Sequence, residues 1–311
     1  MNRAAIEQAA HLAATRPHFL RRTPLWQLPG SAFGVPCAEV WLKLEHLQAS
    51  GSFKARGMLH RLLSNPIPAS GVIVASGGNA GIATAAAARE LGVPCEVFVP
   101  TVSSAAKQAK LRELGAKVVV TGAAYADALQ ACLTRQAETG ALLTHAYDQP
   151  EVVAGAGTLA REIEAQAGVP DSVLVSVGGG GLIAGVASWF EDCSRVIALE
   201  PELAPTLHAA RAAGEPVDVP VSGVAADSLG AKRIGAIAWD VAQRFVPQSL
   251  LLPDSAIRAA QLWLWKEMKL AVEPAAALGL AALQTGAYVP AADERVCLIV
   301  CGANVDPGTL A

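Results

Sequence analysis

Four consecutive glycines, Gly178 to Gly181, stand between an apolar segment and a stretch that predicts a short helix. Glycine lets the backbone adopt conformations in which several N–H groups converge, and the N-terminus of a helix adds partial positive charge. The motif therefore predicts an anion cradle that is best suited to a phosphate group. A tight turn chosen only for its conformational freedom is the alternative, and four glycines in a row at this place favour the cradle.

The glycine turn alone leaves the kind of phosphate ligand open. Gly179, Gly181 and Ala184 satisfy a relaxed form of the dinucleotide-binding fingerprint, and Glu200 ends the next predicted strand about twenty residues further on. A nicotinamide-dependent oxidoreductase that binds NAD is therefore one hypothesis that this motif supports.

A second motif, SGSFKARG at residues 50–57, places Lys54 where a helix is predicted to begin. A lysine near the positive end of a helix is poised for a lowered pKa, which Schiff-base chemistry requires. The neighbouring Phe53 could lie against a flat ring. An ordinary surface lysine is the alternative, and it would be preferred if this motif stood alone.

A third motif, SGGNAG at residues 76–81, is another loop between a predicted strand and a predicted helix. Its backbone donors suit a carboxylate, and Asn79 offers an amide to a hydroxyl or phenolate oxygen. A plain glycine turn explains this loop equally well when it is taken by itself. Two anion cradles and an activatable lysine, however, fit a phosphate cofactor and an amino-acid substrate better than they fit NAD.

Apolar segments that alternate with helical patterns would position these loops. Strands are predicted at residues 71–76, 95–99, 117–121, 172–177, 195–199 and 295–301. Helices are predicted after the SGGNAG loop through residue 89, and at residues 107–115, 124–139, 182–190, 255–268 and 275–285. Continuously apolar strands that alternate with helices indicate a parallel sheet covered on both faces. The predicted class is therefore α/β with open sheets, which bind ligands at the carboxyl ends of their strands.

The composition supports a large core and argues against several partners. Of the 311 residues, 52% are hydrophobic and 16% are charged, and the formal net charge is −3 with no block of like charges. Nucleic acids and membrane surfaces require clustered Lys and Arg, so neither is expected as a partner. The N-terminus has no segment typical of a signal peptide, and no later segment has the roughly 18 apolar residues of a membrane span. Six cysteines without CxxC spacing fit reduced thiols in a cytoplasmic enzyme.

Taken in order, these motifs resemble those of the fold-type II enzymes that depend on pyridoxal phosphate (PLP). Within that group the chain is most similar to the serine/threonine dehydratases. The resemblance covers residues 23–304 and rests on five segments in the order WLKLEHLQASGSFKARG, SGGNAG, SVGGGGL, VEPAAALG and CGAN. Residues 228–235, SLGAKRIG, also resemble a segment of the short, liver-type serine dehydratases. The resemblance implies two open, twisted, mostly parallel sheets flanked by helices, as in the β subunit of tryptophan synthase.

The resemblance assigns the central chemistry to three residues. Lys54 would hold PLP as a Schiff base and would act as the base on the substrate Cα, while Phe53 would pack on the cofactor ring. Cys301 stands where the family places the group that meets the pyridine nitrogen, although a buried strand thiol is the alternative. A thiol is a weak partner for that nitrogen, and such tuning would favour rapid β-elimination.

The resemblance also assigns the binding contacts. The phosphate would be bound by the backbone amides of Gly178, Gly179, Gly180 and Gly181. Asn79 would donate to the ring oxygen of the cofactor. The carboxylate of the substrate would lie against Ser76, Gly78 and Ala80.

Two further positions carry implications from the same resemblance. Glu200, with the carbonyl of Ala204, would bind a K⁺ or Mg²⁺ ion near the phosphate loop, and a strand-end carboxylate in water is the alternative. Family members with racemase activity carry a serine where this chain has Gly77. Because glycine has no side-chain proton to donate, we expect little or no racemisation.

These assignments predict a domain division and an assembly. A small domain would cover residues 46–145, and residues 1–45 and 146–311 would form the large, PLP-binding domain. Lys54 would lie in the cleft between them. The resemblance implies a homodimer, and the short sequence after Asn304 leads us to expect a catabolic enzyme without a regulatory domain.

The function expected from these residues is the removal of water and ammonia from L-serine, L-threonine or a related β-hydroxy amino acid, which gives a 2-keto acid. β-Replacement of the cysteine synthase type, a nicotinamide-dependent oxidoreductase and a non-catalytic PLP carrier are the alternatives. The sequence does not rank the hydroxy amino acids, because contacts to one methylene group are worth only about 1–3 kcal/mol.

Overall fold

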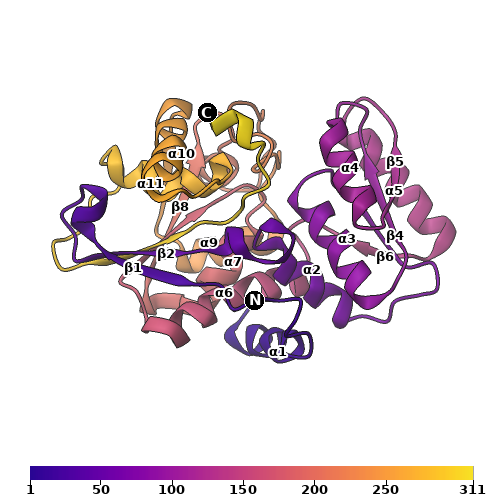
Figure 1. The fold of residues 1–311 in the computed structure, drawn as a ribbon, viewed down its shortest axis with the longest axis horizontal. Helices are drawn as coiled ribbons and strands as arrows, with labels where there is room; N and C mark the ends of the chain where they lie inside the picture. Colours follow the sequence, from indigo (N-terminus) through magenta and orange to yellow (C-terminus); the bar gives the residue numbers. More distant parts are fainter. Residues whose placement is uncertain (311) are drawn as a thin grey trace.

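The computed structural model describes residues 1–310 and contains two β-sheets, each flanked by helices (Figure 1). The larger sheet has the strand order β1-β2-β10-β7-β8-β9, and all neighbours are parallel except the antiparallel pair of β1 and β2. Its strands are β1 (Leu25–Pro29), β2 (Glu39–Lys43), β7 (Ser172–Ser176), β8 (Arg195–Pro201), β9 (Gln248–Leu252) and β10 (Arg295–Ile299). The part of the chain built around this sheet is called the large lobe below.

Helices cover the large sheet on both faces. The helices α7 (Gly181–Phe190) and α11 (Leu278–Gln284) both contact β7 and β8, and every residue of β7 is buried. A strand that is buried along its whole length needs cover on both sides, which explains the apolar residues Val173, Leu174 and Val175 at its centre. The remaining helices of this lobe are α1 (Arg3–Ala13), α6 (Pro150–Ala167), α8 (Thr206–Ala213), α9 (Ala236–Phe245) and α10 (Asp254–Met268).

The smaller sheet is entirely parallel and forms the core of the small lobe. Its strand order is β5-β4-β3-β6, with β3 (Val72–Ala75), β4 (Cys95–Val99), β5 (Lys117–Val120) and β6 (Leu142–Thr144). Val72 and Val74 pack into one apolar cluster, with residues of α3 (Asn79–Leu91). Ile73 and Ala75 pack into another, with residues of α5 (Tyr125–Thr139). The alternation along β3 therefore places α3 and α5 on opposite faces; α4 (Ala105–Glu113) packs beside β5.

The structure confirms the predicted α/β class with two open, mostly parallel sheets. β4 has the bounds predicted for it, residues 95–99. The predicted helix at residues 275–285 is instead a 3-10 turn at Pro274–Ala277 followed by α11. The predicted domain boundaries, 46–145 for the small domain and 1–45 with 146–311 for the large one, stay a prediction.

The helix α2 (Lys54–Leu63) carries the candidate lysine and packs against helices of both lobes, α6 and α3. Its contact with α6 is very close, because a Cβ at Gly57 would lie 2.6 Å from the carbonyl oxygen of Val152. A Cβ at Gly155 would likewise lie 2.6 Å from the carbonyl oxygen of Arg56. These glycines let the two backbones touch, which fixes the position from which Lys54 projects.

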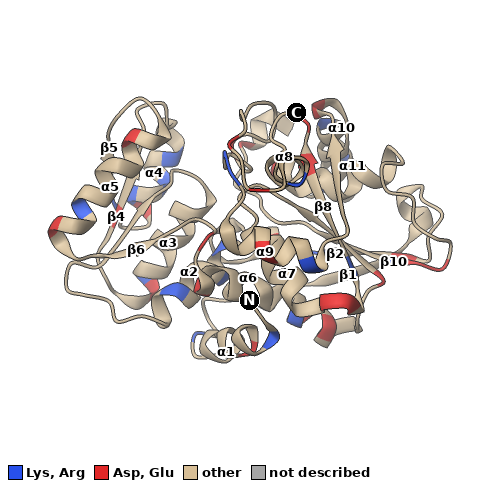
Figure 2. Ribbon diagram, turned by 180° about the vertical axis from the view of Figure 1, so that it is seen from behind, with Lys and Arg blue, Asp and Glu red and all other residues tan. Residues whose placement is uncertain are grey.

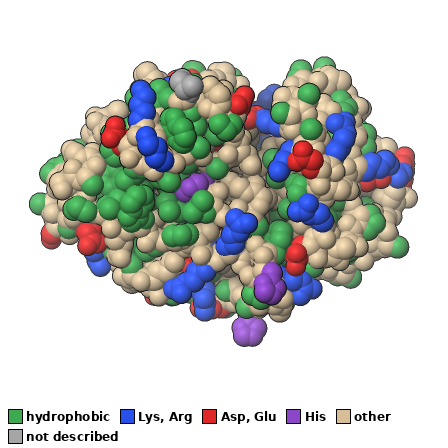
Figure 3. Space-filling view, viewed as in Figure 1, with side chains coloured by type: hydrophobic (Ala, Val, Ile, Leu, Met, Phe, Trp, Pro, Cys, Tyr) green, Lys and Arg blue, Asp and Glu red, His purple; other side chains and the backbone are tan. Residues whose placement is uncertain are grey.

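The surface carries no dominant charge. Figure 2 shows Lys and Arg interspersed with Asp and Glu along the helices of both lobes. Figure 3 shows hydrophobic side chains gathered on the large lobe, over the region where Figure 1 places β1, α10 and α11. No helix within residues 1–310 is both long and apolar enough to cross a membrane.

Candidate active site

One cavity brings together the three motifs that could do chemistry. It is narrow, with a volume of about 50 Å³, which is below the range of about 300–1,000 Å³ that is usual for small-molecule and cofactor sites. Residues from both lobes line it, among them Phe53, Lys54, Asn79, Gly178, Gly179, Gly180, Gly181, Glu273 and Cys301. The residues predicted to bind the cofactor therefore surround a single space, although they are spread over nearly 250 residues of sequence.

Lys54 is the first residue of α2, and its side chain reaches the cavity. Its Nζ donates to the carbonyl oxygen of Ala146 at 2.6 Å and lies 5.0 Å from the centre of the Phe53 ring. Burial lowers the pKa of Lys54 to about 8, against the weaker opposing effects of Cys301 and Glu273. A substantial fraction of the amine is therefore neutral near physiological pH, as a nucleophile or base must be.

The glycine loop, residues 178–181, joins β7 to α7 at the carboxyl end of the sheet. Gly180 has a φ of 88°, which glycine adopts without strain. A Cβ at Gly179 would overlap the ring of Tyr147, and a Cβ at Gly178 would lie 3.1 Å from the Cα of Leu229. The loop is thus a bare backbone surface at the start of a ten-residue helix, which suits a phosphate group.

Asn79 is the first residue of α3, and its amide is held between two side chains. Its Nδ2 donates to Glu273 Oε1 at 2.7 Å, and its Oδ1 accepts from Asn304 Nδ2 at 2.6 Å. Glu273 is 5% exposed, and burial raises its pKa to about 7. No role was predicted for Glu273 or Asn304 from the sequence, although each lies inside a segment that carries the resemblance, VEPAAALG or CGAN.

Cys301 follows β10 and is 3% exposed beside the cavity. Its carbonyl oxygen accepts from the backbone N–H of Phe53 at 3.0 Å, so the end of β10 is tied to the start of α2. Burial raises the pKa of Cys301 well above its ordinary value, and nearby Glu273 adds to the effect. The thiol is therefore protonated and can act only as a weak neutral hydrogen-bond partner.

The predicted substrate-binding residues Ser76, Gly78 and Ala80 lie in the loop that leads from β3 into α3. Ser76 Oγ accepts from the backbone N–H of Gly78 at 3.4 Å. At Gly77, an added Cβ would lie 2.9 Å from Ser103 Oγ, so a side chain there requires Ser103 to move. Asn79 lines the cavity, whereas Ser76, Gly78 and Ala80 are not among its lining residues, and their role in holding a carboxylate stays a prediction.

Glu200 is fully buried at the end of β8. Its carboxylate accepts from Ser249 Oγ at 2.6 Å, from the backbone N–H groups of Leu207 and His208, and from Thr206 Oγ1. Thr206 Oγ1 also donates to the Gly178 carbonyl at 2.6 Å, which links this carboxylate to the glycine loop. Burial raises the pKa of Glu200 in spite of these bonds. A cation held by Glu200 and the Ala204 carbonyl would share the carboxylate with these donors, and that site stays a prediction.

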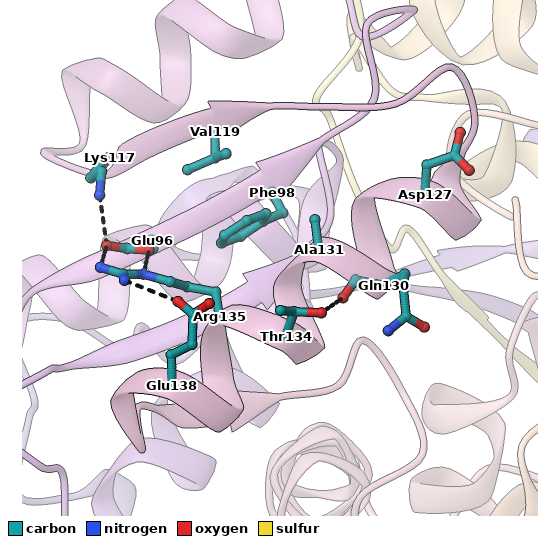
Figure 4. A pocket seen from close by; sticks show the side chains of 10 residues that line it. All are labelled: Glu96, Phe98, Lys117, Val119, Asp127, Gln130, Ala131, Thr134, Arg135 and Glu138. Carbon is teal, nitrogen blue, oxygen red and sulfur yellow. Dashed lines mark hydrogen bonds and ion pairs between the residues drawn. The ribbon is translucent and has the colours of Figure 1, made fainter.

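A wider and more open groove lies on the small lobe, between α5 and the strands β4 and β5 (Figure 4). Its charged residues are engaged with one another: Glu96 pairs with Lys117 at 2.9 Å and with Arg135 at 3.2 Å. Asp127 accepts from two backbone N–H groups at the start of α5. Because these groups are already satisfied, the groove offers no comparable set of available chemical groups, and the cavity at Lys54 is the candidate active site.

The donor set around that cavity fits PLP. The amine with a lowered pKa can react with an aldehyde, and the bare glycine loop can bind a phosphate. The oriented amide can donate to a phenolate oxygen, and the neutral thiol can lie against a pyridine nitrogen. Among residues 1–310, by contrast, no group of three or more His, Cys, Asp or Glu side chains is arranged to hold a metal ion.

Comparisons with known proteins point the same way. The family described as "Pyridoxal-phosphate dependent enzyme" matches residues 17–302. The L-threonine ammonia-lyase of Geobacter sulfurreducens is 37% identical over 89% of this chain and 69% of its own length. The phenylserine dehydratase of Ralstonia pickettii is 36% identical over 97% of this chain and 94% of its own length. Among solved structures, maize serine racemase superposes with a TM-score of 0.91 and 29% identity, over 99% of this chain and 95% of that one.

Proposed function

Because the chain belongs to the fold-type II, PLP-dependent serine/threonine dehydratase family, we propose that it removes water and ammonia from a small L-β-hydroxy amino acid. L-Serine, L-threonine and related β-hydroxy amino acids are the substrates that this proposal covers. The water lost in the elimination is taken up again when the released enamine, as its imine, hydrolyses, so that the net products are the corresponding 2-keto acid and ammonia. The observation that carries the proposal is the single cavity in which Lys54, the glycine loop, Asn79 and Cys301 meet.

The cofactor, when bound, withdraws electrons from the substrate and thereby makes its Cα proton acidic. Lys54 would hold the cofactor and take this proton, because its amine is the basic group in the cavity with a lowered pKa. The glycine loop would fix the phosphate through backbone N–H groups, and the loop of residues 76–81 would orient the substrate carboxylate. Cys301, kept neutral by burial, would leave the pyridine nitrogen without a carboxylate partner.

The assembly and the cellular setting form a second part of the proposal. A homodimer would bury hydrophobic surface such as the side chains of Trp26 and Trp265, which are exposed on the large lobe. All six cysteines are free, which fits a reducing cytoplasm. The proposal also includes a catabolic role. It further includes a K⁺ or Mg²⁺ ion bound by Glu200 and the carbonyl of Ala204. Light scattering tests the dimer, and assays after dialysis against chelator and tetramethylammonium test the ion.

The decisive assay is 2-keto acid release from L-serine, L-threonine and L-phenylserine, with the Lys54→Ala variant as control. We expect turnover of at least one of the three by a yellow protein, and none by the variant. A yellow protein that releases no keto acid from any of them, but combines O-acetylserine with sulfide, would replace dehydration by β-replacement. A colourless protein that is stabilised by NADH would contradict the proposal altogether.

A further inference from the structure

The amide of Asn79 is fixed by a donor on one side and an acceptor on the other. Asn304 Nδ2 donates to Asn79 Oδ1 at 2.6 Å, and Asn79 Nδ2 donates to Glu273 Oε1 at 2.7 Å. Only one of the two orientations of the Asn79 amide satisfies both neighbours. The second hydrogen on Asn79 Nδ2 has no acceptor within residues 1–310, and Asn79 lines the cavity. One N–H of Asn79 is thus left for a ligand.

Asn304 is itself held in one orientation. Its Nδ2 also donates to the carbonyl oxygen of Ser50 at 2.9 Å, so both of its N–H groups are in use. Ser50 has a φ of 62°, a left-handed conformation that is uncommon for a residue other than glycine. This turn presents the Ser50 carbonyl to Asn304. Hydrogen bonds therefore run in one direction, from Asn304 to Asn79 to Glu273.

Two glycines make room for this Asn304–Asn79–Glu273 chain of hydrogen bonds. A Cβ at Gly302 would overlap Glu273 Oε1, and a Cβ at Gly51 would lie 2.8 Å from Asn304 Oδ1. The backbone N–H of Glu273 donates to the Gly302 carbonyl at 3.1 Å. The carboxylate is therefore held by its own backbone as well as by Asn79, and the arrangement does not depend on mobile surface groups.

We propose that Glu273 and Asn304 are positioning residues, which lock Asn79 so that its remaining N–H donates to the ring oxygen of the bound cofactor. The inference rests on the proposed function, since it needs PLP in the cavity. Asn79 opens α3 on the small lobe, whereas Glu273 and Asn304 lie in loops of the large lobe. The same hydrogen bonds therefore hold the start of α3 on the small lobe against these two loops of the large lobe.

The test compares Glu273→Ala and Asn304→Ala with Glu294→Ala in the cofactor-loaded enzyme. Glu294 is a matched control, because it is also a buried, hydrogen-bonded glutamate but precedes β10 and contacts Ser172 and Tyr288. Each of the first two variants should weaken PLP binding about tenfold, the effect of one hydrogen bond, and should shift the visible absorption band of the cofactor. Glu294→Ala should lower the melting temperature and leave the band and the affinity unchanged.

Two conservative variants keep the inference falsifiable if the alanine variants do not fold. Glu273→Gln retains an acceptor for Asn79 and should restore the wild-type band, whereas Asn304→Asp replaces the donor by an acceptor and should shift it. Wild-type bands and PLP affinities in the Glu273 and Asn304 variants would overturn the inference while leaving the dehydratase intact. A wild-type protein that binds no PLP would instead refute the proposed function.

Discussion

Two basic side chains that stand two residues apart at the start of α2 have opposite surroundings. Arg56 is 5% exposed, and its guanidinium bonds to both oxygens of Glu45 at 2.7 Å and also pairs with Glu162. Lys54 faces the cavity and, within residues 1–310, forms no ion pair; its amine donates only to the Ala146 carbonyl. The same turn of helix therefore carries one paired cation and one unpaired cation.

The difference shows that pairing, and not burial alone, separates a structural charge from a reactive one. Burial opposes the charge of Arg56, but Glu45 and Glu162 outweigh it and raise the pKa of Arg56 above its usual value. Burial lowers the pKa of Lys54 to about 8, because no carboxylate is close enough to compensate. The Arg56 network holds α2 in place, and the unpaired amine two residues earlier is available for chemistry.

Replacing Lys54 or Arg56 by methionine tests the difference between the two side chains most strongly. Lys54→Met should reduce keto acid release by about ten-thousandfold or more, since the amine that holds the cofactor and moves the proton is gone. Its free energy of unfolding, measured with urea, should stay the same or rise. Substantial keto acid release by a correctly folded Lys54→Met protein would contradict the role given to this residue.

Arg56→Met should have the opposite profile, with its main effect on stability. The change takes the arginine away from the buried Glu45 and from the partly buried Glu162, which keeps Lys43 at 3.5 Å, and breaking a buried pair in this way typically costs about 3–5 kcal/mol. Urea unfolding measures the loss. Arg56→Met combined with Glu45→Gln should recover part of it, because one of the orphaned charges is then removed. An Arg56→Met protein as stable as the wild type would show that the network is not structural.

The fold shows which features a single sequence can predict. β4 was placed correctly because Cys95–Val99 is apolar apart from Glu96 and is rich in the β-branched and aromatic residues that favour strands. β1 was missed, because this edge strand, Leu25–Pro29, is largely exposed and ends in a proline. α6 was missed because its Gly155 and Gly157 lower helix propensity. Their value lies in close contacts with α2 and α7, which only the assembled structure reveals.

The candidate site was predictable where one short motif carries the chemistry. Lys54 and the glycine loop could be identified from their residue types and their neighbours in the sequence, and the structure places both at one cavity. Glu273 was not foreseen, because its contact with Asn79 joins residues 194 positions apart. No local pattern encodes such a distant pairing. Its position before a proline in VEPAAALG was the one available signal, and it says nothing about burial or hydrogen bonding.

The carboxyl groups allow a pH test of the same comparison. Burial alone would raise the pKa of Glu45, but Arg56 holds it below its usual value, whereas burial raises the pKa of Glu273 to about 7. A raised pKa means that the folded state binds more protons than the unfolded state, so Glu273 costs stability as the pH rises from about 4.5 through 7.

Glu273→Gln should therefore gain stability relative to the wild type as the pH rises from 5 to 8, by up to about 3 kcal/mol. Urea unfolding of both cofactor-free proteins at the two pH values measures the difference. Glu294→Gln is the control, because the pKa of Glu294 is lowered, so that this carboxyl is ionised throughout the range and its difference from the wild type should stay nearly constant from pH 5 to 8. A constant difference between Glu273→Gln and the wild type would show that Glu273 does not titrate in this range.

The smallest effect is expected for an exposed pair that also bridges the lobes. Lys107 on α4 pairs with Asp227 on the large lobe, and the side chain of Asp227 is 68% exposed. Solvent screens such pairs, so Lys107→Ala should change the free energy of unfolding by no more than about 1 kcal/mol. If Lys107→Ala lowered the free energy of unfolding as much as Arg56→Met is expected to, exposed and buried ion pairs would contribute equally to stability, which contradicts the comparison.

Reduction of the yellow protein with borohydride, followed by peptide mapping, tests the central claim most directly. Lys43 is a demanding comparison, because it is fully buried but donates to Thr23 and Gln166 and lies 3.5 Å from Glu162. The account predicts a phosphopyridoxyl group on the peptide that contains Lys54, and on no other lysine. A label on a different lysine, or a protein that carries none, would contradict the claim that the unpaired amine at the start of α2 holds the cofactor.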